Sequence, residues 1–427
     1  MIATVARSES EEGFKWDPFT PILTSQQAPG VRCGQLKTSP SCRGHSIAIS
    51  PYTENPKPSI FATTASSQLM RLILHIGSDK TGTTSIQKAL SLSRNYLAQK
   101  GVLYPQLENS DNHNLLAVSF MGKERRHPRR LVRRYGNSDA VLSASGNAWL
   151  AIKQQLEQND FHTVILSGEH FFGLDQHHEL AEQNKRTFPD LENTQIIAYL
   201  RRPSSHYVAR LQQRLKAQHH IAMPERIAYS ARLAGWESAG NLQLCEFNKA
   251  ALHSRDIVQD FWKRTLGSLP LPPGATSIRS NKSLSAEGLY LLQRFRHIRY
   301  PDREGIFFRD SDQLLKRTLM VEESNCQNAS FTRLRLHQDI RNHIDYSTDD
   351  NEILLKKHGF QFDFLKRETP PRNSLLHGLH EPLSLTDIVS VDMAKVDLLV
   401  ELLRTDKRVL APRRWLLNRK LRACLQT

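Results

Sequence analysis

The stretch LILHIGSDKTGTTSIQKAL, from Leu72 to Leu90, constrains the fold more than any other part of this 427-residue chain. Its apolar, β-branched beginning predicts a buried strand at Leu72–Ile76. Two glycines, Gly77 and Gly82, predict a tight turn, and apolar residues recur at helical spacing after it. A strand, a turn and a helix in this order predict the first unit of an α/β fold.

The rest of the chain continues this alternation. The sequence predicts further strands at 162–167, 194–200 and 242–247, and helices at 147–158, 179–186, 204–218 and 255–266. We therefore expect an α/β fold with a parallel sheet flanked by helices. Ligands of such sheets bind beyond the carboxyl ends of the strands, so the turns GSDKTGTT, GEHFFG and RRPSSHY should meet in one crevice.

The two ends of the chain look different from its middle. Residues 1–69 hold seven prolines and no sustained apolar period, which predicts disorder. Met70 directly precedes the first strand, so we interpret it as the natural start and 1–69 as a wrongly assigned extension, with a regulatory tail as the alternative. Residues 70–365 should form the main domain. Residues 366–427 should form a helical C-terminal extension that ends in the basic amphipathic stretch PRRWLLNRKLR.

Composition excludes several classes of protein. The formal net charge of +15 suits an anionic partner but does not choose among a nucleic acid, a membrane surface and an acidic small molecule. No aromatic-interleaved or helix-turn-helix pattern predicts nucleic-acid binding, and no apolar run predicts a transmembrane segment. Five scattered cysteines without a CxxC pair predict no metal site and a reducing, cytoplasmic compartment.

One basic run stands out in the sequence. The segment Lys123–Arg134 holds seven Lys and Arg residues and one acid. We interpret it as a solvated surface. The alternative is a patch that gathers an anionic glycan or lipid headgroup near an acceptor.

The turn after the first strand predicts an anion site. A helix N-terminus leaves backbone N–H groups unpaired and carries a positive dipole end. Gly82 permits close approach to the backbone, Thr83 and Thr84 add hydroxyl donors, and Lys80 adds a full charge. The alternative is an ordinary strand–helix turn with a surface lysine.

The turn differs from the phosphate loop of nucleotide hydrolases, G-x-x-x-x-G-K-[ST]. Lys80 lies two residues before Gly82, and Thr81 therefore cannot occupy the first helical position. The second strand is followed by Glu169 and not by an aspartate that could hold magnesium. A phosphotransferase of the kinase type that uses ATP and magnesium is therefore the second hypothesis.

The segment HIGSDKTGTTSIQ resembles the 5′-phosphosulfate loop of sulfotransferases that use 3′-phosphoadenosine 5′-phosphosulfate (PAPS), above all the bacterial type. VILSGEHF and IIAYLRRPSSHYVARLQQ resemble the next two family segments, and the likeness covers about residues 70–290. The resemblance implies a P-loop NTPase-like sulfotransferase fold. It also implies transfer of a sulfuryl group, without a metal, to a hydroxyl or amine, with a carbohydrate as the expected acceptor.

The resemblance also implies which residues bind the donor. Lys80 would contact the bridging oxygen and the sulfuryl group, and the positions around the 5′-phosphate would be Thr81, Gly82, Thr83, Thr84 and Ser85. Arg201 would hold the 3′-phosphate, with Arg202 and Ser204 beside it.

One position departs from the family pattern. Ala209 stands where relatives carry a serine that donates to the 3′-phosphate. Ser204, Ser205 or Tyr207 could compensate. If none does, the chain would be a non-catalytic or weakly binding relative, which is the third hypothesis.

Sulfuryl transfer needs a base that takes the acceptor proton. Glu169, directly after the second strand, is the first choice, although it could instead be a salt-bridge partner of Arg201. His170 and His113 are second choices, because a histidine titrates near neutral pH. His75 lies within a strand, and we interpret it as structural.

Overall fold

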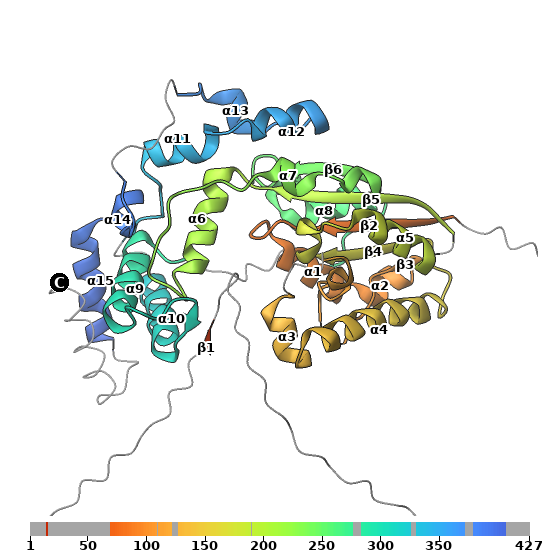
Figure 1. Ribbon diagram of the computed structural model, residues 1–427, viewed down its shortest axis with the longest axis horizontal. Coiled ribbons are helices and arrows are strands. Elements are labelled where there is room, and N and C mark those ends of the chain that lie inside the picture. The colour runs from red at the N-terminus through yellow and green to blue at the C-terminus, as the bar shows by residue number, and fades with distance from the viewer. Residues whose placement is uncertain are drawn as a thin grey trace, which may run out of the picture. The chain divides into compact units, whose positions relative to one another are not determined.

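Five parallel strands form the central sheet, in the order β3-β4-β2-β5-β6 (Figure 1). Their bounds are Val102–Leu103 (β3), Thr163–Gly168 (β4), Met70–Ile76 (β2), Leu191–Leu200 (β5) and Asn241–Glu246 (β6). The computed structural model describes residues 14–15, 69–108, 110–121, 127–188, 190–275, 283–325, 330–371 and 379–406. The predicted α/β class with a parallel sheet is confirmed.

Successive side chains of a strand point to opposite faces of the sheet, and in this sheet both faces are apolar. In β2, Leu72, Leu74 and Ile76 enter one core, whereas Ile73 enters the other. Parallel strands that are buried on both faces need helices on each side. The near-continuous apolar runs of the sequence are the consequence.

The helices divide between the two faces of the sheet. The core on one face receives side chains from α1 (Thr83–Leu92), α2 (Arg94–Ala98) and α8 (Ile257–Leu266). The core on the other face receives them from α4 (Ser138–Leu156), α5 (His177–Thr187), α7 (Tyr229–Leu233), α12 (Asp350–His358) and α13 (Asp363–Arg367). The short helix α3 (Arg129–Tyr135) packs on α4.

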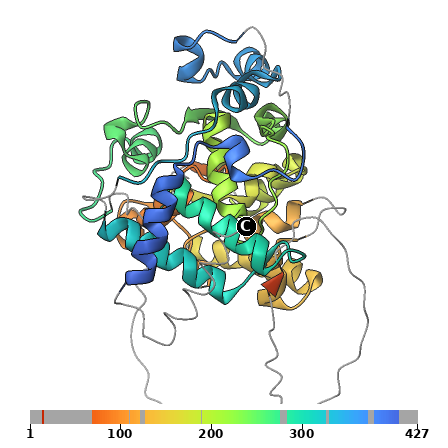
Figure 2. The ribbon, with the colours of Figure 1, turned by 90° about the vertical axis from the view of Figure 1, so that its left-hand side faces the viewer.

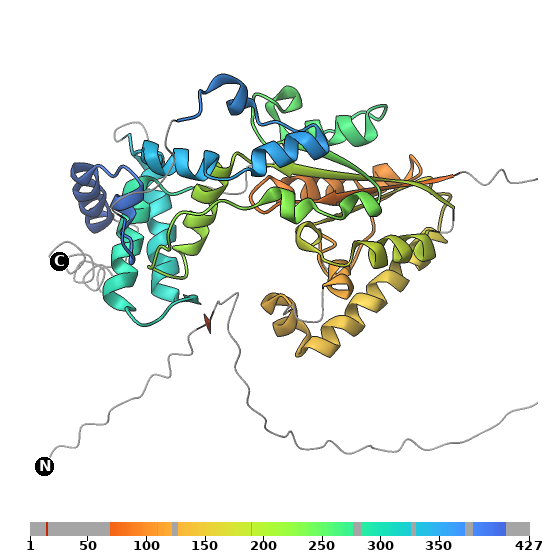
Figure 3. The ribbon, with the colours of Figure 1, turned by 45° about the horizontal axis from the view of Figure 1, so that its top comes forward.

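A third, mainly helical core lies beside the sheet. It is built from α6 (Pro203–Arg214), α9 (Ala286–Arg299), α10 (Arg309–Ser324), α11 (Gln338–Tyr346), α14 (Leu385–Ile388) and α15 (Met393–Thr405). Figure 2 shows α15 beside α9, and the two helices are in contact. Helices α11 and α12 follow one another and pack on α6 and α7, respectively (Figure 3).

The helical core combines segments from both sides of residue 365, where the sequence predicted the end of the main domain. Two helices after that residue, α14 and α15, pack against α9. The structure describes neither the PRRWLLNRKLR stretch nor most of residues 1–69, so those predictions lie outside the described residues. Of the N-terminal segment, β1 (Phe14–Lys15) pairs antiparallel with β7 (Ile306–Phe307). Within the described residues, no helix is long and apolar enough to cross a membrane.

The register of the sheet places the ends of three strands together. Ile76, the last residue of β2, pairs with Gly168 of β4, and His75 pairs with Ile197 of β5. The turns that follow β2, β4 and β5 therefore leave the sheet at the same edge, which is where ligands of parallel sheets bind.

Candidate functional site

The turn between β2 and α1 needs left-handed backbone at two residues. Lys80 has a φ of +63° and Gly82 a φ of +81°. Gly82 is the N-cap residue of α1, and no side chain caps the helix. The first N–H groups of α1 are therefore left for another acceptor, an arrangement that suits an anion.

The hydroxyl groups of the turn divide into two pairs. Thr81 and Thr83 are buried, and both donate to the carbonyl oxygen of Ser78, at 2.6 and 3.4 Å. Thr84 is exposed and Ser85 is half-buried. Thr84 and Ser85 are thus the hydroxyls that a ligand can reach, whereas Thr81 and Thr83 hold the turn together.

Two ammonium groups meet at one neutral oxygen. Lys80 donates to Oε1 of Gln213 at 3.4 Å, and Lys216 donates to the same atom at 3.3 Å. Burial, and then the charge of Lys80, lower the pKa of Lys216. Two like charges that share an amide oxygen form a strongly electropositive point.

Sequence reasoning missed Gln213 and Lys216. They lie at the end of α6 and just beyond it, more than 130 positions from Lys80 in the chain. Their spacing of three residues was the available signal, but it does not by itself indicate what the pair faces.

Arg201 reaches the turn as the sequence predicted. Its Nη1 donates to the carbonyl oxygen of Lys80 at 3.2 Å, and its guanidinium carbon lies 5.8 Å from the centre of the Phe247 ring. Burial lowers the pKa of Arg201. No carboxylate of the described residues forms an ion pair with Arg201, so the predicted alternative of a bridge to Glu169 is not formed.

Asp79 adds a negative charge to the turn, and this charge is already paired. His206 Nε2 lies 2.8 Å from Asp79 Oδ1, and Arg210 Nε lies 3.7 Å from Oδ2. Burial acts to raise the pKa of Asp79, but the hydrogen bond from His206 and the nearby positive charges outweigh it, so the pKa is lowered. The carboxylate therefore fastens the turn to α6.

Glu169 follows β4 and faces the same turn. Burial and the charge of Asp79 raise its pKa, while the charge of Lys80 and the polar Thr83 side chain act in the opposite direction. The structure thus brings Glu169 to the turn that carries Lys80, as expected from the strand order. A carboxylate with a raised pKa is a better proton acceptor than an exposed one.

The two histidines proposed as alternative bases differ in position. His113 is buried, its Nδ1 accepts from the backbone N–H of Ser167 at 2.9 Å, and its Nε2 donates to the Pro105 carbonyl oxygen at 2.9 Å. Burial lowers its pKa to about 4. Because both ring nitrogens bind backbone, His113 is structural here. His170 begins a short 3₁₀ helix, and its backbone N–H donates to Asn114.

Arg202 and Ser204 are engaged by carboxylates, contrary to the expectation that they hold a phosphate. Arg202 forms ion pairs with Asp345 at 2.8 Å and with Glu368 at 2.6 Å, and it stacks on the Phe364 ring at 3.9 Å. Ser204 donates its backbone N–H and its hydroxyl to Asp345, each at 2.9 Å. The donors that a phosphate would need are therefore occupied.

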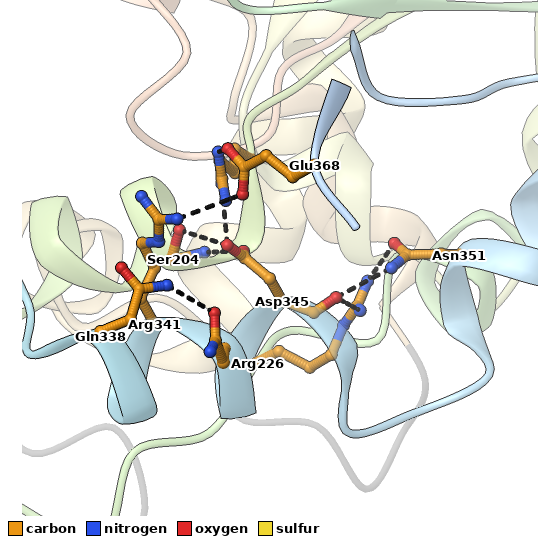
Figure 4. Close-up of polar contacts among 9 residues, drawn as sticks. Ser204, Arg226, Gln338, Arg341, Asp345, Asn351 and Glu368 are labelled. Atoms are coloured by element: carbon orange, nitrogen blue, oxygen red, sulfur yellow. Dashed lines mark hydrogen bonds and ion pairs between the residues drawn. The ribbon is translucent and has the colours of Figure 1, made fainter. Parts of the chain in front are cut away.

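Asp345 is the centre of this polar cluster (Figure 4). Its side chain is fully buried, and its carbonyl oxygen accepts from Arg226 at 3.2 Å and from Asn351 at 2.8 Å. The cluster joins α11 to the start of α6 and to the segment before α7. It is a structural junction next to the candidate site.

A cavity of about 250 Å³ lies along α6. Its lining includes His206, Arg210 and Arg214 of that helix, and Glu225 and Glu381 from other segments. His206 and Arg210 also contact Asp79, so the cavity adjoins the turn without including Lys80 or Glu169.

We expect Gly82→Ala to destabilise the protein by about 1–2 kcal/mol, because an alanine is strained at a φ of +81°. An added Cβ would also lie 3.1 Å from Ile257 and Phe247. Urea unfolding measures the effect. The matched control is Gly146→Ala in α4, where the added Cβ meets no atom within 4 Å and should be stabilising. Equal effects of both substitutions would contradict the assignment.

Asp345→Asn should lower the free energy of unfolding by about 3 kcal/mol, because it leaves the Arg202 guanidinium without one buried partner. Asp312→Asn is the control, since its ion pair with Lys316 is exposed and should contribute less than about 1 kcal/mol. Denaturant titration of both variants compares them. A loss no larger for Asp345→Asn than for the control would refute the central role of Asp345.

Comparison with models of protein families, with curated proteins and with solved structures gave no match. The function of the chain is therefore argued from the geometry of the turn and its surroundings.

Proposed function

We propose that the chain transfers a sulfuryl group from PAPS to a hydroxyl or amine acceptor, with carbohydrates as the expected acceptor class. The observation that carries the proposal is the convergence at one edge of the sheet. The uncapped start of α1 lies there, with the ammonium groups of Lys80 and Lys216 and the guanidinium of Arg201. We further propose that the sheet is a P-loop NTPase-like sulfotransferase fold, with the anion loop after its central strand.

The donor would lie across the turn. The N–H groups that open α1, with the hydroxyls of Thr84 and Ser85, would hold the 5′-phosphate, and Arg201 would hold the 3′-phosphate. Ser205 lies one helical turn before Ala209 and is half-buried. It is the serine that would replace the missing donor, because Ser204 is bound to Asp345.

In the transfer step, the acceptor oxygen or nitrogen would attack the sulfur, and the bond from sulfur to the 5′-phosphate oxygen would break. Glu169 would take the acceptor proton. Lys80 would stabilise the negative charge that develops on the leaving phosphate. The products would be the sulfated acceptor and adenosine 3′,5′-bisphosphate (3′,5′-ADP). Lys216, next to Lys80, would add a second positive charge near the group in transfer.

The acceptor would enter through the cavity along α6. His206 and Arg210 line it and contact Asp79, the residue before Lys80. The lining mixes guanidinium and carboxylate groups, which suits a polar acceptor with many hydroxyls.

A phosphotransferase that uses ATP and magnesium fits the turn less well. The hydroxyl that follows the lysine, Thr81 Oγ1, is buried and donates to Ser78 at 2.6 Å. It would have to break this bond to bind magnesium. A non-catalytic relative would bind the donor through the same groups, and turnover distinguishes it.

We expect 3′,5′-ADP to raise the melting temperature of the protein without added metal, because its two phosphates would bind the start of α1 and Arg201. Arg201→Met should remove most of this shift. The control Lys88→Met changes an exposed lysine of α1 and should keep it. Thermal-shift titration measures the effect. A larger shift with ADP and magnesium than with 3′,5′-ADP would favour the phosphotransferase instead.

Glu169→Gln should slow transfer by about 10²–10⁴-fold, because the amide cannot accept the proton. The raised pKa of Glu169 gives the sign of the pH dependence: the wild-type rate should fall as pH drops through a pKa above the usual 4.5, since protonation removes the base. The variant should lose this dependence but keep its thermal shift with 3′,5′-ADP.

Release of 3′,5′-ADP from PAPS, measured against pH with a panel of glycan acceptors, tests the role of Glu169. An unchanged rate and pH profile in the variant would contradict the role of Glu169 and would indicate that His170 is the base.

A further inference from the structure

Three potential metal ligands meet beyond the end of α6. They are His219 and His220, which follow that helix, and Glu304, which lies between α9 and β7. One ligand atom of each residue lies within 4.8 Å of the other two. His219 is buried, Glu304 is half-buried and His220 is exposed, so the cluster opens to solvent on one side.

The backbone fixes the carboxylate of Glu304. Its Oε1 accepts from the N–H groups of His219 and His220, at 3.0 and 3.3 Å, and its Oε2 accepts from the N–H of His219 at 3.2 Å. The carboxylate therefore has a defined orientation before any ligand arrives, which reduces the entropy lost on binding.

One imidazole nitrogen of each histidine lies near the same carboxylate oxygen. The Nδ1 atoms of His219 and His220 lie 2.5 and 3.2 Å from Oε1 of Glu304, and the two rings are 4.1 Å apart. The Nδ1 atom of His219 is buried, and despite its short distance from the carboxylate it forms no hydrogen bond of acceptable geometry. This buried nitrogen is therefore without a hydrogen-bond partner among the described residues.

We propose that His219, His220 and Glu304 bind a divalent first-row transition metal ion, with Zn²⁺ as the preferred ion. Two imidazole nitrogens and one carboxylate are a donor set typical of zinc, and water would complete the coordination on the exposed side of His220. Zinc ligands lie about 2.0–2.2 Å from the ion, so the Nδ1 atom of His219 has to move away from Oε1 of Glu304 to make room for it.

Burial and nearby charges affect His219. Burial has the largest effect on the pKa of His219 and lowers it, while the charge of Glu304 acts to raise it. The buried guanidinium of Arg296 also lowers that pKa and opposes an added positive charge. We therefore expect a single site of moderate affinity.

The ion would fasten the chain after α6 to the loop between α9 and β7. Gln218, His220 and Ile221 of this segment line the cavity along α6. The site is separate from the turn after β2, and it does not depend on the sulfuryl-transfer proposal. The ion would fix one wall of the cavity.

Isothermal titration of the full-length chain with ZnCl₂, after removal of metal with EDTA and dialysis, tests the proposal. We expect one saturable site in the wild-type protein. His220→Ala should weaken it by about tenfold or more, and Glu304→Gln should do the same. His178→Ala is the matched control, since this exposed histidine of α5 lies outside the cluster and its loss should leave the affinity unchanged.

Zinc should also raise the melting temperature of the wild-type protein more than that of His220→Ala. Because His220 is exposed, its substitution should leave the fold intact. Absence of a saturable zinc site, or equal zinc affinity in the wild type and His220→Ala, would overturn the proposal. A loss of affinity in Glu304→Gln alone would also overturn it, since it would indicate a change in the loop and not the loss of a ligand.

Discussion

The candidate site depends on the pairing of β2 with β4 on one side and β5 on the other. Because the three strands are parallel and in register at Ile76–Gly168 and His75–Ile197, their carboxyl ends share one edge. The turns that follow therefore lie close together, and they carry the lysine, the glutamate and the arginine of the site. Left-handed backbone at Gly82 then directs the start of α1 to the same edge.

The balance of charge at this edge favours an anion. Lys80 and Lys216 share a neutral amide oxygen, and Arg201 donates to a backbone carbonyl. The one carboxylate within the turn, Asp79, is paired with His206 and Arg210 of α6. Positive groups with neutral partners attract a ligand more strongly than those already neutralised, because a ligand need not displace an existing ion pair.

The helical part of the chain limits which side chains are free to bind a ligand at the site. Through Asp345 and Glu368 it binds Arg202 and Ser204, which follow β5 directly. Desolvating these groups is costly unless they are paired, and the buried carboxylate pairs them. Arg202, which the sequence alone suggests is free to bind a ligand, instead joins the two cores. Arg201 is the arginine that donates to the backbone of the turn.

The sequence determined the elements that depend on local pattern. The strands at 72–76 and 194–200, the helices after them and the parallel sheet follow from apolar periodicity and glycine placement, and the structure has them. It also indicated that Lys80, Glu169 and Arg201 would meet, because each follows a strand of that sheet.

Only the tertiary structure decided the partners of individual side chains. Asp345 lies 141 positions from Ser204, Lys216 is brought to Lys80 by the path of α6, and Glu304 meets two histidines 84 and 85 positions away. Such pairings depend on how packed helices cross, which periodicity does not specify. The physical reason is that a pattern along the chain fixes which face is buried, while charge pairing between distant segments follows from the packing of those faces.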